Sequence, residues 1–100
     1  MTRRQWLLVK LMEECDETSQ RASKSAIFGG DEIEPKEGET RTNDERILGE
    51  FCHIVAYLEI LKTEGFLPWN TDMMTYEIEK KRQEIEKWYQ HSIDQGQIKE

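Results

Sequence analysis

The chain has 100 residues, of which 14 are Lys or Arg and 21 are Asp or Glu, and its net charge is −7. This length suits one small domain, and such an acidic chain lacks the basic surface needed to bind a nucleic-acid polymer or an anionic membrane. The sequence predicts neither a membrane-spanning segment nor a signal peptide, so we expect a cytoplasmic protein. The two cysteines do not have the spacing of a zinc finger or a disulfide framework.

The first predicted element is a helix over residues 2–27, which contain no Pro or Gly. At about 100° per residue, one face of this helix is apolar. Its members are Leu8, Leu11, Met12, Cys15, Ser19, Ala22 and Ala26. We expect Phe28-Gly29-Gly30 to end the helix, with glycine in the left-handed conformation as the cap. The acidic segment 28–41 is predicted to be a long loop, acting as a solvated lid or spacer.

Two further helices are predicted. Thr42 and Glu45 have the spacing of a capping box, which begins a helix that runs to about Glu64. A broad apolar face predicts that this helix is the most buried one. That face comprises Ile47, Phe51, Ile54, Val55, Leu58 and Leu61. The third helix is expected to be capped by Thr71 or Asp72 and to end near Gly96.

No alternation typical of strands occurs, and the predicted fold class is all-α. We expect a single domain over residues 1–100, organised as a helical bundle of three main helices. Only 36% of the residues are hydrophobic, which gives a thin core. We therefore expect oligomerisation to complete the bundle.

Acidic residues on the first helix suggest a metal site. Glu14 and Glu17 are three residues apart, so their carboxylates project side by side and repel each other unless a cation lies between them. Mg²⁺ is commonly bound by one or two carboxylates together with substrate phosphates. The alternative is a solvated face on which Lys10 pairs with Glu14 and Glu17 pairs with Arg21.

A polar stripe follows one margin of the second helix's apolar face, formed by Arg46, Glu50, His53 and Tyr57. Glu50 and His53 repeat the three-residue spacing seen in the first helix. Two facing helices that each offer such a pair can surround a metal within a bundle. The alternative is that His53 forms a hydrogen bond at the core edge while Glu50 pairs with Arg46.

The chain resembles the MazG-like all-α nucleoside triphosphate pyrophosphohydrolases, and most closely their short, phage-type members. The resemblance rests on residues 10–17 (KLMEECDE), Lys24 and residues 50–56 (EFCHIVA), and extends to 22–24, 28–29, 42–46 and the tail 79–96. A Glu-Glu-x-x-Glu motif followed on a later helix by Glu-x-x-Asp marks that family. The resemblance implies a homodimer or homotetramer that hydrolyses a nucleoside or deoxynucleoside triphosphate to the monophosphate and pyrophosphate.

The resemblance also implies roles by motif position. Glu14, Glu17 and Glu50 would hold the metal, Mg²⁺ or Mn²⁺, and His53 would complete this metal-binding set. Glu13 would be a further ligand or would orient the attacking water, which makes Glu13, Glu14 and Glu17 the expected catalytic residues.

Cationic residues would then contact the substrate phosphates. Lys24 and Arg21 are the candidates on the first helix. The third helix has a narrow apolar stripe, and Lys81 lies inside it. The Lys81 side chain reaches either solvent or a phosphate pocket.

The chain departs from the family pattern at His53, where the family has Asp. A neutral imidazole is a poorer ligand than a carboxylate for Mg²⁺ and suits Mn²⁺, Zn²⁺ or iron better. We therefore expect a preference for Mn²⁺, a weakened enzyme, or a non-catalytic relative that binds or sequesters nucleotide. A helical oligomerisation module with the third helix as its interface is the remaining alternative.

Overall fold

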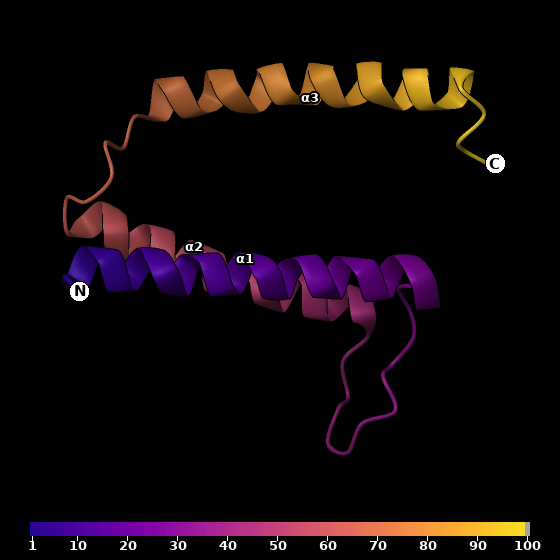
Figure 1. The fold of residues 1–100 in the computed structure, drawn as a ribbon, viewed down its shortest axis with the longest axis horizontal. Coiled ribbons are helices and arrows are strands. Elements are labelled where there is room, and N and C mark those ends of the chain that lie inside the picture. Colours follow the sequence, from indigo (N-terminus) through magenta and orange to yellow (C-terminus); the bar gives the residue numbers. More distant parts are fainter. Residues whose placement is uncertain (100) are drawn as a thin grey trace. The chain divides into compact units, whose positions relative to one another are not determined.

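The computed structural model of the chain describes residues 1–99. It contains three helices, α1 (Arg3–Phe28), α2 (Asn43–Thr63) and α3 (Thr71–Asp94), and residues 1–99 form no strand (Figure 1). The expected all-α fold with three helices is therefore confirmed. One compact unit covers Met1–Pro68, and a second begins at Trp69. None of the described helices is both long and apolar enough to cross a membrane.

Capping boxes begin the first two helices. At α1, Thr2 Oγ1 accepts a hydrogen bond from the Gln5 backbone N–H, and Gln5 Oε1 accepts one from the Thr2 N–H. At α2, the predicted box forms as expected. Thr42 Oγ1 accepts from the Glu45 N–H at 3.1 Å, and Glu45 Oε1 accepts from the Thr42 N–H at 3.0 Å. Each box satisfies two amide donors that have no partner within the helix.

Two expected caps differ in detail. Asn70, rather than Thr71 or Asp72, caps α3, because its Oδ1 accepts a hydrogen bond from the Met73 N–H at 3.0 Å. The short Asn side chain is among the strongest N-caps because it reaches these amides easily. Gly29 ends α1 with φ 96° and ψ 146°. The positive φ suits glycine, but the residue is extended rather than left-handed helical.

Helices α1 and α2 lie side by side and antiparallel (Figure 1). Three cross-helix contacts follow one register: Arg3 with Glu64, Glu14 with His53, and Ser25 with Asp44. The facing residues, which we call the α1–α2 seam, are all buried or half-buried. They are Leu7, Leu11, Glu14, Thr18, Arg21 and Ser25 on α1, and Asn43, Arg46, Glu50, Ile54, Tyr57 and Leu61 on α2.

The seam changes character along its length. Leu7 and Leu61, the two fully buried apolar residues of the described chain, lie at the end nearest the N-terminus. Acidic residues occupy the middle, and arginines follow towards the loop between the helices. The remaining buried residues, Asn43 and Arg46, are polar and belong to α2. The prediction that α2 is the most buried helix is confirmed, since it holds three of the four buried residues of the described chain, but Phe51 of its predicted apolar face is 52% exposed.

The expected orientation of α1 is wrong. In its predicted apolar face only Leu8 and Leu11 are half-buried, and the other five members are exposed. The α1 residues of the seam lie roughly 100° around the helix from that face, so Glu14 and Arg21 point towards α2. Helical spacing identifies two stripes on α1, but it does not say which stripe meets a partner. The stripe that packs on α2 buries Leu7 at one end, and its charged members find partners on α2 and in the loop.

Candidate functional site

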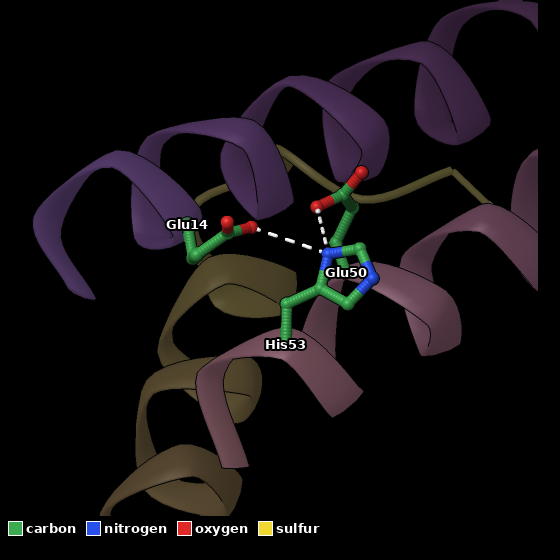
Figure 2. Close-up of side chains that lie close together, drawn as sticks. All are labelled: Glu14, Glu50 and His53. Carbon is green, nitrogen blue, oxygen red and sulfur yellow. Dashed lines mark hydrogen bonds and ion pairs between the residues drawn. The ribbon is translucent and has the colours of Figure 1, made fainter. Parts of the chain in front are cut away.

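Glu14 on α1 faces Glu50 and His53 on α2 across the middle of the seam (Figure 2). His53 Nδ1 lies 3.3 Å from Glu14 Oε2 and 3.2 Å from Glu50 Oε2. One potential ligand atom from each residue lies within 4.8 Å of the others. We call these three residues the acid–histidine cluster.

The acid–histidine cluster is only partly hydrated. The side chains of Glu14 and Glu50 are 19% and 17% exposed, whereas that of His53 is 57% exposed. Ionised carboxylates only accept hydrogen bonds, so His53 Nδ1 must carry a proton to bond to them when no cation is present. Two partly dehydrated carboxylates therefore meet on one polar nitrogen, an arrangement that concentrates negative charge inside a helix pair.

The geometry of the acid–histidine cluster fits a divalent cation. Ligand atoms that bind one metal at about 2.0–2.2 Å lie roughly 3 Å apart, close to the two distances at Nδ1. Two carboxylates and an imidazole are donors that suit Mn²⁺, Zn²⁺ or iron better than Mg²⁺. The acid–histidine cluster could thus offer three ligand atoms from two helices, with His53 open to solvent on one side.

The other predicted acidic residues lie outside the acid–histidine cluster. Glu17 follows Glu14 by three residues, which turns it roughly 60° around α1, and it is exposed. Glu13 is also exposed, and its Oε2 lies 3.2 Å from Lys10 Nζ. The structure thus brings Glu14 together with Glu50 and His53, but not with Glu13 or Glu17. The suggested Lys10–Glu14 pair is replaced by Lys10–Glu13.

A second charged cluster lies in the seam beside the first. Arg21 and Lys24 of α1 and Arg46 of α2 surround Glu34, which comes from the loop between the helices. Glu34 Oε1 accepts a hydrogen bond from Lys24 Nζ at 2.8 Å, and Glu34 Oε2 accepts one from Arg46 Nη1. Arg21 Nη1 lies 3.6 Å from Glu34 Oε2. We call the three cations and Glu34 the Glu34 cluster. The suggested pairs Glu17–Arg21 and Glu50–Arg46 are not formed.

Electrostatics at the Glu34 cluster hold the carboxylate in its charged form. The hydrogen bond from Lys24, and then the one from Arg46, lower the pKa of Glu34 to about 2. Glu39 Oε2 lies 3.6 Å from Arg46 Nε, on the other side of that guanidinium. Its pKa is also lowered, mainly because its carboxylate accepts a hydrogen bond from the Arg41 N–H.

The loop between α1 and α2 is tied down at both ends. Asn43 donates from Nδ2 to the Gly29 carbonyl at 2.9 Å, and its backbone N–H donates to the Glu32 carbonyl at 2.8 Å. The Asp44 N–H donates to the Gly30 carbonyl at 3.1 Å. A Cβ at Gly30 would lie 2.1 Å from Asp44 Oδ2, so a side chain here would push the Asp44 carboxylate out of its present position beside Ser25. The expected solvated spacer is therefore an anchored loop that places one carboxylate in the seam.

Sequence reasoning missed the role of Glu34 and the burial of Arg46. The sequence carried a signal for the burial of Arg46 and for an acidic partner in the loop, but not for which loop residue it is. Arg46 is spaced four residues before Glu50, on the same stripe of α2, so it had to enter the seam with Glu50. Buried arginines require an acidic partner, and the adjoining loop is the most acidic part of the chain.

Lys81, the third predicted phosphate ligand, lies on α3 in the second unit. Its Nζ lies 3.8 Å from Glu84 Oε2, and both side chains are exposed. Within α3 it therefore lies on a solvated surface. Its contact with phosphate remains a prediction.

An open hollow lies at the opposite end of the seam from the Glu34 cluster. It is lined by Arg3, Ala56, Glu59, Ile60, Thr63 and Glu64. The hydrogen bond from Arg3 lowers the pKa of Glu64. This ion pair joins the ends of the two helices, and the hollow does not reach the two charged clusters.

Comparison of the chain with protein-family models, with curated proteins and with solved structures finds no match. The candidate site therefore stands on its residues and their geometry. Two features define it: the acid–histidine cluster and, next to it in the seam, the Glu34 cluster.

Proposed function

We propose that this chain is a divalent-metal-dependent pyrophosphohydrolase of nucleoside or deoxynucleoside triphosphates. The observation that carries the proposal is the juxtaposition of an acid–histidine cluster with a set of cations in one helix–helix seam. A metal–triphosphate complex needs both, because carboxylates bind the metal while arginine and lysine bind phosphate oxygens. The motif resemblance described above supplies the reaction type.

The metal would be held by Glu14, Glu50 and His53. Glu13 is adjacent to Glu14 in the sequence, and Glu17 lies about one turn further along α1. These two carboxylates would hold or orient the attacking water. When bound, the metal would neutralise phosphate charge and lower the pKa of a bound water. The imidazole in this set favours Mn²⁺ over Mg²⁺.

The substrate phosphates would be bound by Arg21 and Lys24 of α1, while Lys81 of α3 is a further candidate. Water would add across the bond between the α and β phosphates. One new P–O bond forms, the bridging P–O bond breaks, and the products are a nucleoside monophosphate and pyrophosphate, with the water proton released to the carboxylates or to solvent. The protein would work on nucleotides within a cell, with a homodimer or homotetramer as the working form.

His53 favours a second candidate function. It replaces one carboxylate of the family motif and so removes a negative charge from the metal-binding set. The fold would then bind or sequester nucleotide without hydrolysing it. In that case both clusters would bind the nucleotide, but the nucleotide would not be hydrolysed.

The test is a panel of nucleoside and deoxynucleoside triphosphates, each incubated with Mg²⁺ and with Mn²⁺, with products separated by chromatography. We expect monophosphate and pyrophosphate, with faster turnover in Mn²⁺. Glu50→Gln should abolish turnover, whereas Glu59→Gln, on the exposed face of the same helix, should leave it unchanged. Orthophosphate as the only inorganic product would contradict the proposal. Thermal stabilisation by triphosphates without turnover in either metal would select the binding function.

His53→Asp sharpens the choice of metal. The substitution restores the carboxylate of the family motif, and we expect it to shift the preference towards Mg²⁺. A variant that gains activity in Mg²⁺ would identify His53 as the cause of a weakened site. Equal turnover of the wild-type protein in Mg²⁺ and Mn²⁺ would contradict the predicted preference for Mn²⁺.

A further inference from the structure

The Glu34 cluster holds more positive charge than its carboxylates neutralise. Its three cations, Arg21, Lys24 and Arg46, are opposed by Glu34 and by Glu39, which lies 3.6 Å from Arg46. A local charge of about +1 thus occurs inside a protein whose net charge is −7. Cations held this close together repel one another, and a bound anion relieves that repulsion.

The arginines of the Glu34 cluster are withdrawn from solvent. The side chain of Arg46 is 6% exposed and that of Arg21 is 18% exposed. Arg21 Nε and Nη1 are inaccessible to solvent and have no hydrogen-bond acceptor. Buried donors without an acceptor are unfavourable, so Glu34 satisfies this site only in part.

The Glu34 carboxylate does not come within hydrogen-bond distance of all of these donors. The two Glu34 oxygens already bond to Lys24 and Arg46, and Arg21 Nη1 is left 3.6 Å away. A phosphate group carries more negative charge and offers three acceptor oxygens. Its bonds to guanidinium groups can also be bidentate. The site is therefore better matched to phosphate than to the residue that fills it.

The Glu34 cluster lies next to the acid–histidine cluster along the seam. On α2, Arg46 precedes Glu50 by four residues, roughly 6 Å along the axis, and on α1, Arg21 follows Glu14 by seven, roughly 10 Å. A chain of two or three phosphates that is bound to a metal at one cluster would run towards the cations of the other.

We propose that Arg21, Lys24 and Arg46 form a phosphate-binding site, and that Glu34 is its internal competitor. A polyphosphate would displace the Glu34 carboxylate and release the part of the loop that follows Glu32, beyond the points at which Gly30 and Glu32 are tied to the start of α2. Arg21 and Lys24 are also the phosphate ligands of the proposed function, but the part played by Arg46, the competition by Glu34 and the binding of pyrophosphate without metal do not require that function. That its natural ligand is a nucleoside triphosphate rests on that function.

The test is pyrophosphate binding by calorimetry in the presence of EDTA, so that no divalent metal contributes. Glu34→Gln keeps the shape of the side chain and removes its charge, and we expect it to bind pyrophosphate on the order of 10-fold more tightly than the wild-type protein, because the competing state is less populated. The matched control is Glu37→Gln, which removes one charge from an exposed position of the same loop. Arg21→Gln should weaken binding in either background.

Equal gains from Glu34→Gln and Glu37→Gln would overturn the inference, since general electrostatics would then explain both. No gain in a Glu34→Gln protein that keeps its helical circular dichroism would also overturn it. Hydrogen exchange on the wild-type protein gives a second test that needs no variant. Pyrophosphate should accelerate exchange at the Lys36 and Glu39 amides, which bond within the loop, and protection there would contradict displacement.

These outcomes are separable from failure of the proposed function. If the protein hydrolyses no triphosphate but Glu34→Gln binds pyrophosphate more tightly, the anion site is supported and the proposed enzymatic activity is contradicted. If the protein hydrolyses triphosphates but Glu34→Gln shows no tighter binding, the enzymatic activity is supported and the role of Glu34 as a competitor is contradicted.

Discussion

The two ends of the α1–α2 seam differ in what they contribute. At one end, Leu7 and Leu61 are fully buried and carry no polar side-chain atom. From the middle to the other end most of the facing positions are polar, and the charged ones among them form ion pairs between the helices or with the loop. The first end stabilises the pair by removing apolar surface from water, whereas the second costs desolvation free energy that ion pairs only partly offset.

This difference shows which part of the seam stability alone explains. A helix pair designed only to be stable would continue Leu and Ile along the whole seam. Replacing buried ion pairs by well-packed apolar residues is often neutral or stabilising. Charged residues at Glu14, Glu50 and Arg46 therefore point to a requirement other than folding.

The largest expected effect is at the apolar end. Leu61→Ala removes a side chain that is fully buried, and large-to-small substitutions of this kind cost about 2–5 kcal/mol of unfolding free energy. Leu48→Ala is the matched control, because Leu48 lies on the same helix and is 66% exposed; we expect a change within about 0.5 kcal/mol. Urea unfolding followed by circular dichroism measures both. An equal loss at Leu48 would mean that another surface covers it as tightly as α1 covers Leu61.

The next effect is at the acid–histidine cluster and depends on metal. Mn²⁺ at 100 times its dissociation constant should raise the unfolding free energy of the wild-type protein by about 2.7 kcal/mol. Glu50→Gln should lose this gain and, without metal, should be no less stable than wild type, since it relieves the repulsion between Glu14 and Glu50. Thermal unfolding with and without Mn²⁺ measures both. A full Mn²⁺ effect in Glu50→Gln would place the ion elsewhere.

Most of the fold follows from the sequence. Pro, Gly and capping residues fix the limits of the three helices within one or two residues, because these signals act locally. The Thr42–Glu45 box is an example. The stripe of α1 that meets α2 could not be predicted in this way, since it depends on which charges find partners in another element.

The candidate site was predicted in part. Glu14, Glu50 and His53 share a register that two antiparallel helices make possible, and their spacing together with the family resemblance suggested them; the same reasoning included Glu17, which lies outside the acid–histidine cluster. Glu34 could not be placed, because a loop residue has no periodicity from which its direction can be inferred. Its position depends on the hydrogen bonds that tie the loop to Asn43 and Asp44.

A smaller effect is expected at the start of α2, where the charged end of the seam begins. Thr42→Ala removes the hydroxyl that accepts from the Glu45 N–H and should lower the unfolding free energy by about 1 kcal/mol. Thr40→Ala changes an exposed loop residue nearby and is the control. Urea unfolding compares the two. A loss equal to that of Leu61→Ala would show that the cap supports the whole seam rather than one helix end.

The smallest effect is the pH dependence of the Glu34 cluster. The pKa of Glu34 falls from its ordinary value of 4.5 to about 2 when the chain folds. Its ion pairs therefore contribute fully to stability above pH 4.5, and the contribution is lost as the pH falls towards 2, because the unfolded chain takes up the proton first. The effect is small because solvent screens a partly exposed carboxylate.

Glu34→Gln cannot titrate at this position, so its stability relative to wild type should change with pH. We expect the wild-type advantage to be largest above pH 4.5 and to shrink steadily between pH 4.5 and pH 2 in thermal unfolding. Glu37→Gln, in the same loop, provides the reference for loss of a carboxylate without these ion pairs. A wild-type advantage that stays constant over this range would mean that Glu34 is not held by cations in solution. The cations at this end of the seam would then be open to an external anion without competition, which would remove the internal competitor but leave the phosphate site.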